Sequence, residues 1–99
     1  MPHYIILFNF TEQGIRNIKD LEKRAQAFKS TVEKAGGKFV GDSFLYLTLG
    51  KYDTVSIVEA PNDEAILPAI LATARLGNVR CETLKAFTMD EAAKIIERA

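Results

Sequence analysis

Cysteine and histidine are the scarcest reactive residues of this chain, with one of each, Cys81 and His3. A single cysteine cannot form a disulfide within the chain, and it is compatible with a reducing cytoplasm. One cysteine and one histidine also cannot supply the four ligands of a usual structural zinc site. We therefore expect a cytoplasmic protein with neither a bound metal nor another cofactor.

Net charge is also lacking, because 13 acidic residues balance 13 basic ones. Without a positive field the chain has little to attract nucleic acid or an anionic membrane surface. No segment approaches the roughly 20 apolar residues needed to cross a bilayer. The first residues lack the basic flank and cleavage site of a signal peptide. We expect neither nucleic acid nor membrane as a partner.

Motifs of three common enzyme classes are absent too. The chain contains no G-x-x-x-x-G-K phosphate loop, no G-x-G-x-x-G dinucleotide fingerprint and no G-x-S-x-G nucleophile elbow. What remains is an ordinary globular composition, with 47% hydrophobic and 26% charged residues. Since 99 residues are about the size of one domain, we expect a single domain over residues 1–99.

Four strands are predicted. Residues 3–10 are rich in β-branched and aromatic types, and their apolar residues occupy successive positions, which is typical of a central strand covered on both faces. Residues 38–49 indicate a second strand with a bulge or bend at 41–43. A tight turn at 50–53 leads into a third, strongly apolar strand at 54–60, and 79–87 form the fourth.

The longest predicted helix spans residues 15–35. Its apolar residues recur at spacings of three and four, which draws one apolar stripe along a helix. Asp20 and Arg24 have the spacing of a stabilising ion pair on the opposite face. Gly36 and Gly37 supply the left-handed residue that commonly closes a helix.

Two further helices are predicted near the C-terminus. An unusually apolar one covers about residues 63–76, where Pro68 predicts a kink or a delayed start. Thr88, with Glu91 three residues on, has the pattern of a capping box opening a short last helix. We expect the apolar residues of that helix to face inward: Ala92, Ile95 and Ile96.

The order of elements, β-α-β-β-α-β with a trailing helix, predicts an α+β ferredoxin-like fold with a four-stranded antiparallel sheet. We expect the first and third strands side by side and parallel at its centre, joined by a crossover through the long helix. Two helices can cover only one face of such a sheet, which leaves an apolar patch that soluble monomers usually avoid. The sequence therefore predicts a homodimer, with two sheets packed about a two-fold axis into a dimeric α/β barrel.

Stretches of the chain resemble the GYD-domain family: residues 3–20, then 47–53 with 58–64, then 76–88. The family's naming motif is Gly-Tyr-Asp; here Lys51 occupies the glycine position and is followed by Tyr52 and Asp53. The resemblance implies membership of the dimeric α/β-barrel group. That group includes heme-handling proteins, monooxygenases, cyclases and simple ligand binders, so the fold cannot choose among these activities.

Tyr52 and Asp53 have two interpretations. In the structural one, Asp53 hydrogen-bonds nearby backbone N–H groups while Tyr52 packs its ring and finds a partner for its hydroxyl. In the functional one, a phenol and a carboxylate lie at the mouth of the barrel cleft. His3 is a candidate general base on the same strand face as Asn9, or else an interface or surface histidine.

Strand parity assigns roles to other polar residues. Tyr46, Asn9 and Glu59 are candidates for ligand contacts in the cleft, with Glu59 alternatively pairing with a basic residue. Cys81 is interpreted as a small buried filler of the fourth strand. Arg80 and Glu82, on the opposite parity, are expected to form an edge-strand charge pair.

The leading functional hypothesis is a homodimeric small-molecule-binding protein whose ligand lies between the two sheets. One alternative is a cofactor-free enzyme with monooxygenase- or cyclase-like acid–base chemistry on a small apolar substrate, using His3, Tyr52 and Asp53. The other alternative is a structural subunit whose cleft is filled by side chains.

Overall fold

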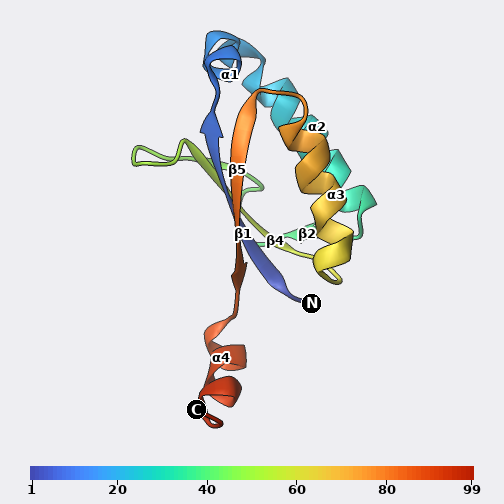
Figure 1. Ribbon diagram of the computed structural model, residues 1–99, viewed down its shortest axis with the longest axis vertical. Helices are drawn as coiled ribbons and strands as arrows, with labels where there is room; N and C mark the ends of the chain where they lie inside the picture. The colour runs from blue at the N-terminus through green and yellow to red at the C-terminus, as the bar shows by residue number, and fades with distance from the viewer.

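A computed structural model describes the whole chain, Met1 to Ala99 (Figure 1). A sheet forms one layer, and two helices lie against one side of it (Figure 1). The elements in chain order are β1 (His3–Phe10), α1 (Glu12–Arg16), the 3₁₀ turn η1 (Ile18–Asp20), α2 (Leu21–Lys34), β2 (Lys38–Phe39), β3 (Tyr46–Leu47), β4 (Thr54–Glu59), α3 (Asp63–Ala74), β5 (Val79–Ala86) and α4 (Met89–Ile96).

The strand order is β2-β4-β1-β5, and β3 also pairs with β4. This order confirms that the two most apolar strands, β1 and β4, occupy the centre. All pairs are antiparallel, including β1 with β4, so the expected parallel direction of these two strands is wrong. The crossover through α2 makes β2 parallel to β1, and β4 returns between them in the opposite direction because a hairpin joins it to β3.

The second predicted strand is divided into two short pieces along β4. Six residues (40–45) separate β2 from β3, whereas only Ser56 and Ile57 separate their partners on β4. The extra residues form a bend in which Gly41 has a φ of 103°, a value that favours glycine. The predicted disturbance is therefore confirmed, and it interrupts the pairing more fully than a simple bulge would.

The helix predicted over 15–35 is broken. Helix α1 begins at Glu12, where the Thr11 side chain accepts a hydrogen bond from the Gly14 N–H, and the chain leaves helical geometry at Asn17 before α2. Arg24 does not pair with Asp20; its guanidinium donates to the carbonyls of Asn17 and Gly14 instead. The apolar spacing continues across this break, so periodicity alone could not reveal it.

Helix α3 begins at Asp63 with Pro68 inside it, so no delayed start occurs. The Asn62 side chain caps this helix by accepting from the Ala65 N–H. The predicted capping box of Thr88 and Glu91 is confirmed. The inward packing expected for α4 is wrong, because this helix extends past the end of the sheet and has no buried residue (Figure 1).

The core lies between the sheet and the pair α2 and α3. Side chains of β1 and β4 alternate between buried and half-buried, as the period of two requires. The Phe8 and Phe28 rings meet edge to face, with centroids 5.2 Å apart, and join β1 to α2. The buried cluster is Tyr4, Ile6, Phe8, Phe28, Val32, Val58, Ala60, Ile66 and Ala69.

Tyr4 also fastens the start of α3 to the sheet. Its hydroxyl donates to the Asp63 carboxylate, and the Lys85 Nζ lies 3.2 Å from the same group. Burial, followed by the bond to Asp63, raises the pKa of Tyr4 to about 12. The Tyr4 hydroxyl and then Lys85 lower the pKa of Asp63.

The close approach of Gly14 to the Asn78 backbone predicts that a side chain at this position is destabilising. A Cβ at this position would lie 1.9 Å from the backbone oxygen of Asn78, so Gly14→Ala forces backbone to move and is expected to cost about 1–3 kcal/mol of unfolding free energy. Gly50 has open space around it and no positive φ, so Gly50→Ala is expected to be neutral or to stabilise by about 0.4–1 kcal/mol. Urea unfolding of both variants checks this, and equal losses would contradict it.

The environment of Tyr4 predicts how the stability of the fold depends on pH. In the unfolded chain Tyr4 ionises near pH 10, but in the fold only at about pH 12. Its contribution to stability is therefore complete below pH 10 and is lost as the pH rises to about 12. In a titration of phenolate absorbance, Tyr4→Phe should remove the last transition and Tyr46→Phe should retain it. Ionisation of folded Tyr4 near pH 10 would refute the proposed environment.

Candidate functional site

The face of the sheet turned away from α2 and α3 is the open face. No helix packs over it (Figure 1). Strand register places the following residues on it: Arg80, Glu82, Leu84 and Ala86 of β5; His3, Ile5, Leu7 and Asn9 of β1; Val55, Ile57 and Glu59 of β4; Lys38 of β2 and Tyr46 of β3. All the candidate residues named from strand parity as facing the cleft therefore share one surface.

The open face has an apolar centre. Ile5, Leu7, Val55 and Ile57 are half-buried by their neighbours within the sheet, and Leu84 beside them is 43% exposed. The polar side chains of β1 lie at its two ends, His3 at one and Asn9 at the other. Such a surface can bury an apolar partner while polar groups at its margins set the orientation.

His3 lies between two carboxylates at the first end of the open face. Its Nε2 is 3.4 Å from Glu59 Oε1, and its Nδ1 is 3.9 Å from Glu91 Oε1. The Nδ1 atom is buried and has no hydrogen-bond partner within the chain. The Glu91 carboxylate also accepts from the Thr88 N–H, and this bond lowers the pKa of Glu91. An imidazole placed in this way can accept or release a proton.

Asp53 lies near the other end of the open face and is committed to the backbone. Its carboxylate accepts from the Phe10 N–H at 2.9 Å, and its own N–H donates to the Phe8 carbonyl at 2.9 Å. These two bonds hold the start of β4 against the end of β1. This is the arrangement that the structural interpretation of the motif expects.

Tyr52 reaches from the turn across to β5. Its hydroxyl donates to Glu82 Oε2 at 3.0 Å, and this bond raises the pKa of Tyr52, so the phenol stays protonated in neutral solution. The Lys51 ammonium lies 5.8 Å from the centre of the Tyr52 ring, within range of a cation–π contact. The turn between β3 and β4 is thereby fixed to the far edge of the sheet.

The candidate acid–base residues do not meet within one chain. His3 pairs with Glu59 in the sheet, whereas Asp53 bonds the backbone of Phe8 and Phe10. The five residue-to-residue steps from His3 to Phe8 span about 16 Å at roughly 3.3 Å per step. Glu59 lies at the His3 end, while Asn9 and Tyr46 lie toward the Tyr52 end. A small molecule could contact one group or the other.

Strand β5, which is the fourth strand predicted from the sequence, departs from expectation in one respect. Arg80 and Glu82 share the open face but form no ion pair, because Glu82 accepts from Tyr52 instead. Cys81 points to the other side and packs against the core, where burial raises the pKa of its thiol. This environment suits a filler rather than a reactive thiolate.

Two polar features on the helix side escaped the sequence analysis. The Tyr4–Asp63–Lys85 cluster lines a groove of about 390 Å³ between α3 and β5, and its members lie too far apart in sequence to form a motif. Arg24 borders a small cavity between α2 and α3. A signal did exist for Arg24, since it lies three residues after Leu21 and four before Phe28, along the edge of the apolar stripe.

The structure contains neither a cluster of metal-ligating side chains nor a helix able to span a membrane. No three His, Cys, Asp or Glu side chains lie close enough together to hold a metal ion. No helix has the length and apolar character that crossing a membrane requires.

The fold has counterparts among solved structures. TTHA0845 from Thermus thermophilus superposes with a TM-score of 0.54 at 23% identity, covering 89% of this chain and 95% of that one. The 30S ribosomal protein S6 of Thermotoga maritima gives a TM-score of 0.53 at 14% identity, covering 98% of each chain. At these identities the likeness shows the fold alone, which is α+β and ferredoxin-like with an antiparallel sheet.

Sequence comparison is more specific. A protein of Thermus thermophilus named "Glutamine synthetase and cystathionine beta-lyase binding protein" is 31% identical over 86 residues, which are 87% of this chain and 88% of that protein. Residues 4–96 match the GYD domain family, in agreement with the resemblance carried by Tyr52, Asp53 and the flanking segments. The chain belongs to the GYD domain family.

Proposed function

We propose that this GYD protein is a homodimer whose two open faces pack together and enclose a cleft for a small, mostly apolar molecule. The observation that carries the proposal is the uncovered apolar centre of β1 and β4. Only 14 of the 99 residues are buried in the single chain, which leaves a small core and a large apolar surface. A second copy packed about a two-fold axis covers that surface without requiring another protein.

The elements around the open face support this assembly. The hairpin between β3 and β4 projects away from α2 and α3 (Figure 1). Helix α4 is only eight residues long, and its exposed Ile95 and Ile96 have no partner surface in the chain. A helix this short is marginal by itself in water, so contact with a second copy would stabilise it.

The polar margins of the open face supply the ligand contacts in this proposal. Asn9 and Tyr46 would orient a ligand toward one end of the cleft, and Glu59 with His3 would do so at the other. The enzyme alternative has less support, because the Asp53 carboxylate is occupied by backbone and the Tyr52 phenol by Glu82. His3 is the one candidate with a free nitrogen.

A matched pair of substitutions tests the dimer. Leu84→Lys places a charge on the open face and should shift the protein from dimer to monomer in size-exclusion light scattering at micromolar concentration. Leu71→Lys places the same charge on α3, where the leucine is 57% exposed on the opposite side, and should leave the dimer intact. If the wild-type protein is a monomer under these conditions, the proposed dimer is wrong. Native mass spectrometry of the purified dimer tests for a retained ligand.

Binding of a larger enzyme is a second candidate function, favoured by the name of the Thermus relative. A surface suited to it lies on α3, where Leu67 and Leu71, one helical turn apart, are exposed. Helices at a protein surface usually present charged residues to water, and an exposed apolar ridge marks an interaction site. This ridge lies on the helix side, so it stays accessible when the open faces pair.

The two variants should have opposite effects on this second function. With immobilised purified glutamine synthetase or cystathionine β-lyase, Leu71→Lys is expected to weaken binding at least about tenfold, as loss of a central apolar anchor does. Leu84→Lys should bind with unchanged intrinsic affinity while being monomeric. Undiminished binding by Leu71→Lys would exclude the α3 ridge, and absence of binding by the wild type would exclude these two enzymes.

A further inference from the structure

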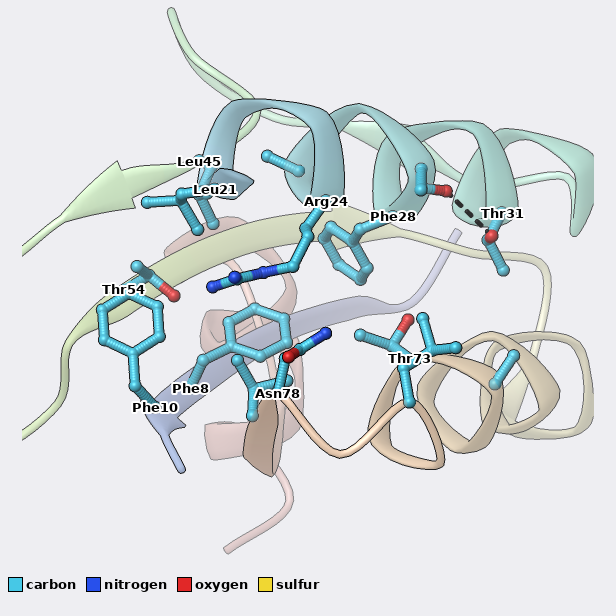
Figure 2. A pocket seen from close by; sticks show the side chains of 15 residues that line it. Phe8, Phe10, Leu21, Arg24, Phe28, Thr31, Leu45, Thr54, Thr73 and Asn78 are labelled. Atoms are coloured by element: carbon cyan, nitrogen blue, oxygen red, sulfur yellow. Dashed lines mark hydrogen bonds between the residues drawn. The ribbon is translucent and has the colours of Figure 1, made fainter. Parts of the chain in front are cut away.

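A small cavity opens between α2 and α3 on the helix side of the sheet, separate from the open face (Figure 2). Its volume is about 80 Å³. Ten of its 15 lining residues are hydrophobic, and the aromatic rings of Phe8, Phe10 and Phe28 form much of its wall. We call this space the interhelical slot.

Arg24 brings a positive charge to the interhelical slot. Figure 2 shows its side chain extending from α2 across the slot toward Thr54. Two guanidinium nitrogens donate to the carbonyls of Asn17, at 2.8 Å, and Gly14, at 3.2 Å. No carboxylate lies within 4.0 Å of this cation. Since a guanidinium has five N–H donors, donors remain for another acceptor.

The Asn78 amide adds further donors to the slot. Its side-chain oxygen accepts from Gln13 Nε2 at 2.9 Å, which leaves its NH₂ group. The Thr31 and Thr73 hydroxyls each donate to a carbonyl of their own helix, at 2.9 Å, so only their acceptor lone pairs remain. A ligand that pairs with Arg24 and Asn78 must offer an acceptor, and Arg24 favours one that carries negative charge.

We propose that the interhelical slot binds a short-chain carboxylate, with the carboxylate on Arg24 and the alkyl tail among the phenylalanine rings. A guanidinium fork matches the two oxygens of a carboxylate in geometry and charge. A water-sized group occupies about 30 Å³, so the slot holds about three such groups. A tail of three carbons corresponds to butyrate.

A chain-length series on the wild-type protein tests this site by two-dimensional NMR titration. Acetate, propionate and butyrate should bind successively about fourfold more tightly, because each buried methylene adds to the affinity. The gain should stop beyond butyrate or pentanoate, where the slot is full. Butanamide, which has the same tail without charge, should bind at least about tenfold more weakly than butyrate. The shifted resonances should centre on Phe28, Thr54 and Asn78.

Three variants separate charge, volume and surface effects. Arg24→Gln should weaken butyrate binding at least about tenfold, while Arg16→Gln, at an exposed position paired with Glu12, should leave it unchanged. Ala72→Leu fills the slot from an exposed position on α3 and should abolish binding with Arg24 intact. Because Ala72→Leu keeps Arg24, it still tests the site if the Arg24→Gln variant unfolds α1.

Several results would overturn the proposal. They are an affinity that does not change with chain length, shifts centred on the open face, and undiminished binding by Ala72→Leu. Because the slot and the open face lie on opposite sides of the sheet, the outcome is independent of the proposed dimer cleft.

Discussion

Side chains of a β-strand alternate between the two faces of a sheet, and most of this structure follows from that constraint. Strand β1 is apolar on both faces, so packing α2 and α3 over one face buries Tyr4, Ile6 and Phe8 while leaving Ile5 and Leu7 without a cover. No further element of the chain packs over the open face. The last helix of the chain, α4, lies past the end of the sheet instead of across it. The hydrophobic pattern that stabilises the fold therefore also favours an assembly.

The elements predicted from the sequence were those whose determinants are local. Strand composition, the Thr88–Glu91 capping box and the bend at 41–43 each depend on neighbouring residues, and all three occur in the structure. The break at Asn17 depends on contacts with other segments of the fold, and the outward course of α4 leaves its apolar residues without packing inside the chain. Gly14, for example, lies against Asn78, and Arg24 satisfies carbonyls of the preceding turn. Apolar periodicity carries no information about either contact.

The candidate site likewise combines features that neighbouring residues predict with features that only the fold determines. Parity correctly assigned His3 and Asn9 to one face, because it requires only the period of the strand. It could not show how far apart these residues lie along the sheet, nor that Asp53 would be used by the Phe10 backbone. The interhelical slot was invisible for a related reason. Its walls come from segments that the fold alone brings together, and its charge comes from a residue that resembles an ordinary surface arginine.

The two edges of the sheet have a consequence for how this protein can associate. One edge is divided into β2 and β3 by the bend at Gly41, and the other, β5, carries the charged side chains Arg80, Glu82 and Lys85. Neither edge offers a long, uncharged run of free backbone groups, which is the template for strand-by-strand growth. Association of copies through a sheet edge is therefore less favourable than association through a face of the sheet. In the homodimer proposed above, contact through one face about a two-fold axis would end with two copies, a closed assembly rather than a fibre.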